Sequence, residues 1–374
     1  MVNRTWCQIV VPILWQYPFG DQWDGGHKIV PVYLGCLPEG TKARIKEMSV
    51  DFPDSALASP TFNYVKYLRR FNFQALHIAV KVWCNDQWFD NFIDRGETLK
   101  SNPVTKLLDI LINCIMEQSL NLKVLEILVT SRRKGEYVNL ESREEFSRPC
   151  LAKIEILECD DCIPKDLTFA SEFCTSLTHL KIECSWGNDK EVSALIKAQK
   201  NLKRLTISKR WPQMRDALES GNLRNSLKIV ELKNNLNLVY NSGPLAVLST
   251  LNNLEVLRFE KWKIFREDNI MELASISFPR LRKIVLSRSK FSPQAINLMI
   301  TTNGAHLQEL TLYWERENSS NQFSHVIRTV AENCPNIRFF DAPVERKEIH
   351  ELYQLLRSCK KLESLIINDS EEEP

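Results

Sequence analysis

The apolar residues of this chain recur in one pattern: an aliphatic residue, two others, an aliphatic or aromatic residue, one other, and again an apolar residue. Leu177-Thr-His-Leu180-Lys-Ile182 is a typical copy. Copies begin at Leu122, Leu151, Leu177, Leu202, Leu227, Leu254, Leu281, Leu307, Ile337 and Leu362, with spacings of 25 to 30 residues. Such a period is typical of leucine-rich repeats. The last two apolar positions alternate with other residues, which predicts a short strand with one buried face.

The stretches between the copies have apolar residues at helical spacing. They include residues 191–199, 269–276, 292–301, 322–333 and 345–358. A strand followed by a helix is therefore the predicted unit. Because one unit cannot bury its apolar face alone, the units must stack side by side. The predicted fold is an α/β leucine-rich-repeat solenoid, a horseshoe with parallel strands inside and helices outside.

We expect the solenoid to cover residues 61–368. Phe73-Gln-Ala-Leu76-His-Ile78 matches the template and precedes a helix-like stretch at residues 104–118, so the array starts before Leu122 with one irregular or missing repeat between. Residues 61–70 are predicted to form a capping helix. Residues 20–60 are predicted to be a linker and irregular segment, and residues 369–374 a frayed acidic tail.

Eleven cysteines are spread over the chain. Their odd number and wide spread disfavour a disulfide framework and suit a reducing compartment. Cys159 and Cys162, with Cys150, Cys174 and Cys184 nearby, are one possible zinc site. The alternative, which we favour, is burial as small apolar residues. Burial explains the positions of four cysteines, each of which precedes a recurring Leu or Ile by one or three residues: Cys150, Cys174, Cys334 and Cys359.

Charge and hydropathy exclude several classes of partner. The chain has 49 Lys and Arg against 47 Asp and Glu, a net charge of +2, so nothing favours nucleic acid or an acidic membrane. No stretch approaches the ~18 to 20 apolar residues of a membrane span, and the first residues lack the pattern of a signal peptide. The sequence predicts a soluble protein of the cytoplasm, the nucleus or both.

The sequence contains no motif of a catalytic site. Gly-x-Ser-x-Gly, His-Glu-x-x-His, phosphate-binding Gly-Lys-Ser or Gly-Lys-Thr and the dinucleotide fingerprint are all absent. The six His are scattered, and His179 and His306 lie in or just before predicted strands, which favours surface or contact roles. We therefore predict no enzymatic activity, no cofactor and no metal. Four tryptophans follow strands at similar offsets and are predicted to pack under the loops rather than to line the edge of the concave face: Trp186, Trp211, Trp262 and Trp314.

The first residues have the spacing of an amphipathic helix. Its predicted apolar side consists of Val2, Trp6, Ile9, Val10 and Ile13. Pro12 is expected to interrupt this helix, and a second short turn could begin there.

Val2-Asn-Arg-Thr-Trp6 followed by Pro12-Ile-Leu-Trp15 resembles the C-terminal half of the F-box. Together with Cys-Pro-Asn-Ile337 and Cys-Lys-Lys-Leu362 in the repeats, the chain resembles the F-box/leucine-rich-repeat family, particularly its expanded fungal F-box-like members. The resemblance implies a substrate receptor of an SCF-type E3 ubiquitin ligase. The F-box would dock on a Skp-type adaptor, and the horseshoe would hold an unknown protein substrate. The implied adaptor-binding residues are Val2, Trp6, Ile9, Val10, Ile13, Leu14 and Trp15.

The leucine-proline start of the F-box would lie before residue 1. Either the gene model is truncated, or adaptor docking has been lost while the recognition module remains. We favour truncation, because Val2-Asn-Arg is expected to begin in mid-helix with no capping residue ahead.

The candidate partner-binding residues alternate with the buried strand positions, which places them on the concave face. They are Lys181, Glu183, Arg204, Glu231, Lys233, Arg258, Glu260, Glu309, Thr311 and Tyr313. Their mixed charges suit a polar protein surface better than a phosphate backbone. For each of them, simple solvation is an equal alternative. A standalone leucine-rich-repeat scaffold or inhibitor, without ligase association, is the alternative function.

Overall fold

The computed structural model describes residues 3–19, 26–47, 54–88, 103–128, 144–160, 163–183, 188–209, 215–219, 221–234, 245–262, 267–289, 291–313, 324–344 and 348–368. The chain forms two compact units, Met1–Ser176 and Leu177–Pro374. Both are built from parallel strands that alternate with helices, so the predicted leucine-rich-repeat fold is confirmed. Among the described residues, no helix has the length and hydropathy needed to cross a membrane.

The first unit contains three parallel strands in the order β1-β2-β3. Its elements are α1 (Arg4–Leu14), η1 (Gly26–Ile29), α2 (Val30–Gly35), α3 (Glu39–Lys46), η2 (Asp54–Leu57), η3 (Tyr64–Tyr67), β1 (Arg70–Asn72), α4 (Phe73–Trp88), α5 (Pro103–Gln118), β2 (Val124–Leu128), α6 (Glu144–Leu151), β3 (Ile156–Asp160) and α7 (Pro164–Phe173). In register, Phe71 lies opposite Leu125, and Leu125 opposite Leu157. All three side chains are fully buried.

The first repeat does not start where the pattern placed it. The prediction of a strand from Phe73 is wrong, because Phe73 begins helix α4 and the strand is β1. The true copy is Leu68-Arg-Arg-Phe71-Asn-Phe73, whose three apolar residues are at most 2% exposed. The apolar run from Phe73 onward matches the strand and helix templates equally well. Pairing of β1 with β2 selects the copy that begins at Leu68.

Two other predicted boundaries also change. Residues 61–70 contain the single 3-10 turn η3 instead of the predicted capping helix. The copy predicted at Leu151 begins at Ile154, since Leu151 ends α6 and Leu157 pairs with Leu125. Proline normally ends a helix, because its nitrogen cannot donate a helical hydrogen bond. Pro149 nevertheless lies inside α6, so the local sequence did not show that the helix continues to Leu151.

The backbone of Gln16 supports the outer edge of β1. Its carbonyl oxygen accepts hydrogen bonds from the N–H groups of Arg69 at 2.9 Å and Arg70 at 3.1 Å. The carbonyl of Arg69 is bonded in the same way by Lys123 and Val124 of the next repeat. Gln16 therefore holds the place that a residue of a preceding repeat would hold, and the segment after α1 caps the strand.

Residues 20–60, predicted to be a linker and irregular segment, contain short helices over their described parts. Helix α2 buries Tyr33 and Leu34, and α3 buries Ile45. Burial raises the pKa of Tyr33 far above its ordinary value. The described parts of this segment therefore contribute buried side chains to the first unit and are not an irregular connection.

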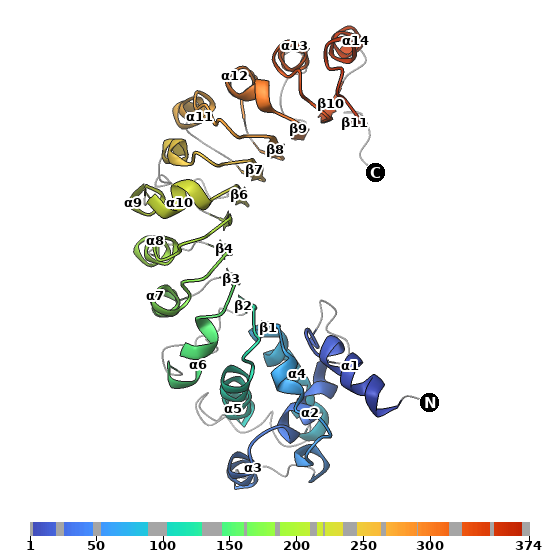
Figure 1. Cartoon of the computed structure of the whole chain (residues 1–374), viewed down its shortest axis with the longest axis vertical. Coiled ribbons are helices and arrows are strands. Elements are labelled where there is room, and N and C mark those ends of the chain that lie inside the picture. The colour runs from blue at the N-terminus through green and yellow to red at the C-terminus, as the bar shows by residue number, and fades with distance from the viewer. Residues whose placement is uncertain are drawn as a thin grey trace. The chain divides into compact units, whose positions relative to one another are not determined.

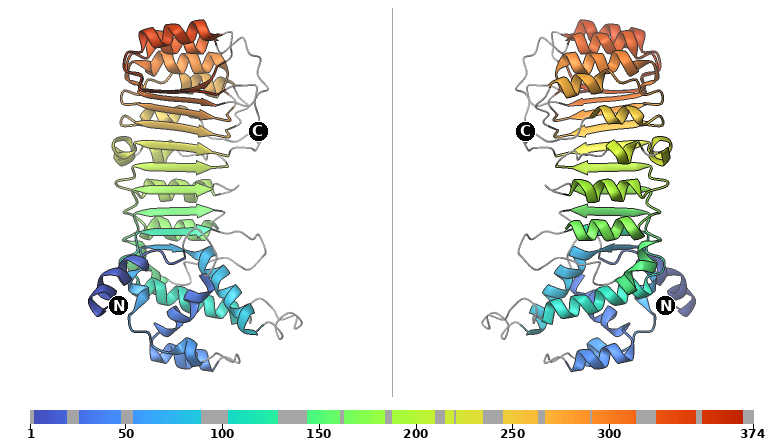
Figure 2. Two further views of the ribbon diagram at one scale, coloured as in Figure 1. Left: turned by 90° about the vertical axis from the view of Figure 1, so that its right-hand side faces the viewer. Right: turned by 90° about the vertical axis from the view of Figure 1, so that its left-hand side faces the viewer.

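The second unit contains eight parallel strands in sequential order, β4 to β11. Its elements are β4 (His179–Glu183), α8 (Asp189–Lys197), β5 (Arg204–Ser208), α9 (Arg215–Leu218), α10 (Gly221–Ser226), β6 (Ile229–Lys233), η5 (Leu245–Thr250), β7 (Val256–Glu260), α11 (Glu267–Ala274), β8 (Lys283–Ser287), α12 (Pro293–Asn303), η6 (Gly304–His306), β9 (Glu309–Tyr313), α13 (Ser324–Asn333), β10 (Phe339–Pro343), α14 (Ile349–Ser358) and β11 (Ser364–Asn368). The predicted helical stretches correspond to α8 and α11 to α14. Within this unit the strands lie side by side along the concave side of an arc, with the helices on the other side (Figures 1 and 2).

The core of the second unit is the layer between its strands and helices. In the repeats of β4 to β10 the three pattern residues are buried in it, as Leu202, Leu205 and Ile207 are without any exposure. Burying one such side chain stabilises the fold by about 1.5–3 kcal/mol. Two buried amides connect neighbouring repeats. Gln199 accepts a hydrogen bond from the backbone of Leu177, and Asn303 accepts one from Phe278.

The four cysteines that precede repeat copies are buried, as the favoured interpretation predicts. Cys150, Cys174 and Cys334 are at most 1% exposed, and burial raises the pKa of each thiol to about 12. Cys359 is also buried, and Cys159 lies in β3 with its side chain in the core. Cys162 and Cys184 lie outside the described residues. No cluster of potential metal ligands occurs among the described residues.

Candidate protein-binding surfaces

The concave face of the second unit carries a cluster of charges around Glu231 on β6. The Nη2 atom of Arg204 donates hydrogen bonds of 2.9 Å to both of its carboxylate oxygens, and the hydroxyl of Thr206 donates one of 2.9 Å. The Nε atom of Arg258 lies 3.3 Å from Oε1, an ion pair without hydrogen-bond geometry. Lys233 Nζ lies 3.9 Å from Oε2. We call these five residues the Glu231 cluster.

Glu231 is buried although it lies on the concave face. Only 3% of its surface is exposed, because β5 and β7 flank it with longer side chains. Burial raises the pKa of its carboxyl group, but the hydrogen bonds from Arg204 and Thr206 and the charges of Arg204 and Lys233 outweigh this effect. The pKa lies below its usual value, so Glu231 is charged and saturated with partners. We assign it a structural role and no direct contact with a partner protein.

Further ion pairs extend this charged area on both sides. Lys233 Nζ lies 3.4 Å from Glu260, and Lys209, just after β5, pairs with Glu183 of β4. Acidic and basic side chains are therefore paired between strands. The mixed charges predicted for this face are present, and they are largely satisfied within the protein.

The first unit repeats the arrangement. Arg70 on β1 pairs through Nε with Glu126 on β2, and Asn72 donates a 2.6 Å hydrogen bond to the same carboxylate. The Arg70 guanidinium also lies 4.5 Å from the ring centroid of Tyr17. Burial lowers the pKa of Arg70, but Glu126 raises it more, so it lies above its usual value. Sequence reasoning missed these residues because the misplaced first copy hid their strand positions.

The part of the concave face formed by β8 to β11 is less charged. Lys283 pairs with Glu309, Thr311 is half-buried, and the guanidinium of Arg288 lies 5.5 Å from the ring centroid of Tyr313. Tyr313 is 39% exposed, and Ile366 on β11 is also a large apolar residue exposed on this part of the face. An aromatic residue next to a cation is a common anchor for a protein partner.

The structure separates the predicted contact residues by accessibility. Tyr313 is exposed and Glu231 is buried, whereas the others are half-buried: Lys181, Glu183, Arg204, Lys233, Arg258, Glu260, Glu309 and Thr311. Accessibility therefore points to the Tyr313 region for direct contact, and sequence periodicity alone could not rank these positions.

Four residues that follow strands β5 to β8 have left-handed backbone conformations. They are Lys209, Asn234, Lys261 and Arg288, with φ between 49° and 69°. In each case the N–H bonds to the carbonyl at the end of the next strand, as from Asn234 to Glu260 at 2.8 Å and from Lys261 to Ser287 at 2.8 Å. The ladder of strand hydrogen bonds compensates for a conformation that lysine and arginine rarely adopt. Three long cationic side chains follow one edge of the sheet as a result.

Helix α1 presents the residues of the F-box resemblance. Trp6, Ile9, Ile13 and Leu14 are each 60–66% exposed, and Val10 is half-buried. Trp15 is half-buried, with its ring centroid 4.2 Å from that of Tyr64. Val2 lies outside the described residues. Four of the seven predicted adaptor-binding side chains are therefore accessible, and three of them, Trp6, Ile9 and Ile13, form an apolar strip along one side of the helix.

Two predictions about this helix are wrong. Asn3 caps it, because its Oδ1 accepts a 2.9 Å hydrogen bond from the N–H of Trp6. The helix therefore does not begin uncapped. Pro12 lies inside α1, which continues to Leu14 without an interruption at the proline. The missing N–H of Pro12 is tolerated on a side of the helix that is half-exposed to solvent.

The aromatic and histidine predictions are tested at three positions. Trp262 is 2% exposed and its ring packs edge-on to Phe259, so packing under the loop is confirmed there. Trp186, Trp211 and Trp314 lie outside the described residues.

His179 is half-buried beside Thr178, and burial and the charges of Arg204 and Lys203 lower its pKa. His306 is exposed.

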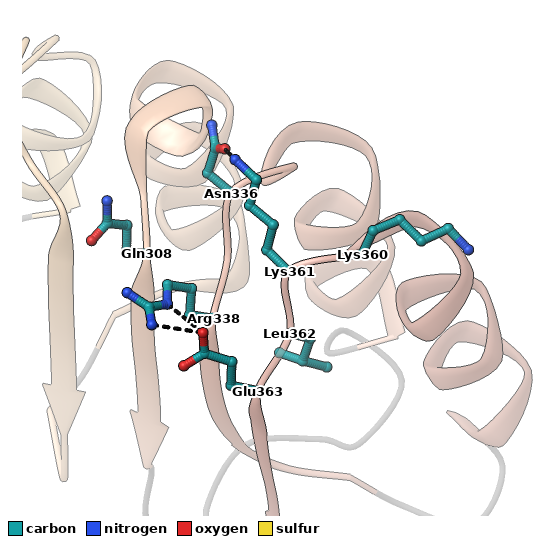
Figure 3. A pocket seen from close by; sticks show the side chains of 7 residues that line it. All are labelled: Gln308, Asn336, Arg338, Lys360, Lys361, Leu362 and Glu363. Carbon is teal, nitrogen blue, oxygen red and sulfur yellow. Dashed lines mark hydrogen bonds and ion pairs between the residues drawn. The ribbon is translucent and has the colours of Figure 1, made fainter.

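A pocket of about 470 Å³ lies at the amino-terminal ends of β9 to β11. Its lining residues are Gln308, Asn336, Arg338, Lys360, Lys361, Leu362 and Glu363 (Figure 3). Arg338 pairs with Glu363, and Lys361 donates a 2.6 Å hydrogen bond to Asn336. Lys360 extends away from the other side chains in Figure 3. The pocket is polar and carries a net positive charge.

No family model and no curated protein matches the sequence. Among solved structures, the chain is similar to one in "Crystal structure of Rad7 and Elc1 complex in yeast". The identity is 15% and the TM-score 0.46, and the match covers 98% of this chain and 92% of the other.

Proposed function

We propose that this protein is a substrate-recognition subunit of an SCF-type E3 ubiquitin ligase and acts by binding, without catalysis of its own. Ubiquitin transfer would belong to other subunits. Its place of action would be the cytoplasm, the nucleus or both. The proposal joins two surfaces, the strip on α1 and the concave face of the second unit.

The observation that carries the proposal is the exposure of α1. An isolated exposed Leu or Ile is normal on a protein surface, but a helix with four large exposed apolar side chains, three of them along one strip, favours a protein partner. Trp6, Ile9 and Ile13 recur at three- and four-residue steps, as in helices that dock in an apolar groove. These residues coincide with the adaptor-contacting positions implied by the F-box resemblance.

The concave face supplies the second surface. Parallel strands present their outward side chains in rows, and the Glu231 cluster holds the charged rows by hydrogen bonds between β5 and β6 and by an ion pair between β6 and β7. A rigid polar surface binds with a smaller loss of side-chain entropy than a mobile one. Tyr313, with Arg288 beside it, is the proposed anchor for the substrate.

The test is co-purification of the full chain with a Skp-type adaptor and a cullin. Ile9→Glu places a charge in the apolar strip and is expected to abolish adaptor binding. Gln8→Glu is the matched control, because Gln8 is exposed and lies about 100° around the helix from Ile9, outside the apolar strip. Retained folding is checked by circular dichroism. Wild-type protein that captures no adaptor, or equal capture by both variants, contradicts the proposal.

Substrate binding is tested separately with Tyr313→Ala. We expect this variant to keep the adaptor and to lose the proteins that proximity labelling finds near the wild-type chain. If the labelled proteins include no ligase subunits but depend on Tyr313, the alternative of a standalone repeat scaffold is favoured.

A further inference from the structure

Cationic side chains outnumber acidic ones on the concave face formed by β4 to β8. Among the residues of these strands and the described residues that directly follow them, eight are cationic and three are acidic. The cationic residues are Lys181, Arg204, Lys209, Lys233, Arg258, Lys261, Lys283 and Arg288. The acidic residues are Glu183, Glu231 and Glu260, and Glu309 and Asp341 lie further along the face on β9 and β10. This part of the face is therefore more positive than the chain as a whole, whose net charge is +2.

The helices on the other side of the same repeats have the opposite balance (Figure 1). The acidic residues within helices α8 to α11 are Asp189, Glu191, Asp216, Glu267, Asp268 and Glu272. The cationic residues within these helices are fewer, and they are Lys190, Lys197, Arg215 and Arg224. Positive charge is thus concentrated on the concave side. A surface with one dominant sign of charge favours partners of the opposite charge and speeds their association.

The acidic residues of this face are largely covered by the cations that pair with them. The side chain of Glu231 is 4% exposed, whereas that of Arg204 is 42% exposed. Arg204 bonds Glu231 through Nη2 alone, which leaves its Nη1 atom without a partner among the described residues. Glu183 is 22% exposed beside Lys209 at 33%, and Glu260 is the most exposed of the three acidic residues at 38%. An approaching protein therefore meets mainly cationic groups.

Two cations at the carboxyl-terminal ends of neighbouring strands have no acidic partner among the described residues. Lys261 follows β7, and Arg288, which is exposed, follows β8. Both have the left-handed backbone that Lys209 has after β5. Lys209 reaches Glu183 on the concave face, and the Arg288 guanidinium lies 5.5 Å from the ring centroid of Tyr313 on the same face. This backbone conformation therefore turns the cationic side chains toward the concave side.

We propose that the concave face of β4 to β8 binds an acidic, extended segment of a partner protein, whose carboxylates pair with Arg204, Lys261 and Arg288. The inference rests on the proposed function, since it specifies the kind of substrate that the same face holds. Neighbouring strands lie about 4.8 Å apart, and alternate side chains of an extended segment lie about 7 Å apart. A segment that crosses the strands therefore places successive carboxylates within reach of the long cationic side chains of successive repeats. Tyr313, next to Arg288, contacts an apolar residue beside the acidic ones.

The same face is poorly suited to a nucleic acid. A phosphate backbone carries a charge at every nucleotide and favours an uninterrupted row of cations. Glu183 and Glu260 interrupt the cations of this face and remain partly exposed. A protein segment can place neutral residues opposite these carboxylates and so avoids contacts between like charges.

Fluorescence anisotropy of labelled octaglutamate with the full chain tests the proposal. We expect octaglutamate to bind and octaglutamine, which has the same length without the charge, not to bind. Raising the ionic strength from about 0.1 M to about 1 M shortens the Debye length from about 10 Å to about 3 Å and is expected to weaken binding at least about tenfold. Equal binding of the two peptides, or tighter binding of octathymidylate than of octaglutamate, overturns the proposal.

Charge reversal locates the site. Lys261→Glu with Arg288→Glu reverses the two cations that have no acidic partner and is expected to raise the dissociation constant of octaglutamate about tenfold. Lys190→Glu with Arg224→Glu is the matched control, because it changes the net charge equally at exposed positions of α8 and α10. This control is expected to bind like the wild type, and circular dichroism checks the folding of both variants. Equal weakening by the two pairs of substitutions overturns the assignment to the concave face.

The peptide experiment needs no adaptor, so its failure is distinguishable from failure of the proposed function. A chain that captures a Skp-type adaptor but does not bind octaglutamate contradicts the acidic partner alone. A chain that binds octaglutamate through Lys261 and Arg288 but captures no adaptor contradicts the ligase association and supports the acidic partner.

Discussion

The Nη2 atom of Arg204 on β5 donates hydrogen bonds of 2.9 Å to both carboxylate oxygens of Glu231 on β6. The pair links two consecutive repeats on the face of the sheet that lacks helices. Arg70 and Glu126 link β1 to β2 in the first unit in the same way. In both units a small polar residue two positions after the arginine, Asn72 or Thr206, also binds the glutamate. Neighbouring repeats are thus connected by polar contacts on one face and by apolar packing on the other.

Replacing Glu231 with Gln should destabilise the protein by about 2–3 kcal/mol. The substitution removes the charge that Arg204 and Arg258 share, and hydrogen bonds to charged groups contribute roughly 1.5–3 kcal/mol. The free energy of unfolding in urea measures this effect. Glu255→Gln is the control, because Glu255 is partly exposed where it pairs with Lys228 and such pairs contribute about 1 kcal/mol or less. Equal losses for both variants would show that burial of Glu231 has no energetic consequence.

The contribution of Glu231 should depend on pH with a definite sign. Its pKa is lowered in the folded state from an ordinary value of 4.5, so the charged form stabilises the fold. This stabilisation is complete above pH 4.5 and is lost as the pH falls through the folded-state pKa. The difference in unfolding free energy between wild type and Glu231→Gln is therefore expected to stay constant near neutral pH and to shrink in acid. A difference that grows in acid would contradict the lowered pKa.

Gly304→Ala should destabilise the second unit. A Cβ atom at this position would lie 2.6 Å from the carbonyl oxygen of Asn333 and 3.0 Å from Sγ of Cys334, so the next repeat would have to shift. Overpacking of this kind costs about 1–3 kcal/mol. Gly221→Ala, where no atom lies within 4 Å, is expected to leave stability unchanged or to raise it by up to about 1 kcal/mol. Thermal unfolding of both variants makes the comparison.

The thiols of Cys150, Cys174 and Cys334 should react slowly in the native protein. Burial excludes reagents and raises the pKa of each thiol to about 12, which leaves little thiolate at pH 8. Modification by a water-soluble disulfide reagent, followed by mass spectrometry, should give these residues low occupancy until denaturant is added. The half-buried Cys7 and Cys36 provide the internal comparison. Rapid native labelling of Cys174 would contradict its burial.

Most strands could be predicted because their pattern is local. Leu202, Leu205 and Ile207 specify a buried face within six residues, and the same spacing recurs in the neighbouring repeats. The prediction failed where one apolar run satisfied two templates, as at Phe73, and where an extra aliphatic residue preceded the true copy, as at Leu151. In both places strand pairing with β2 selects the register, and this information is not local.

The candidate surfaces were predictable only in part. Alternation along the strand correctly placed Glu231 and Tyr313 on the concave face, but it could not show that side chains of β5 and β7 cover Glu231 whereas Tyr313 on β9 stays accessible. The Asn3 cap of α1 and the support of β1 by Gln16 were also missed, since each depends on where a helix begins or on a contact between residues far apart in the sequence.

The repeat period, the alternation of strand and helix and the burial of the cysteines all follow from apolar spacing, because a single repeat must hide its apolar side against a neighbour of the same kind. Accessibility and charge pairing follow from stacking. They depend on which repeats lie next to one another, and spacing within one repeat carries no information about its neighbours.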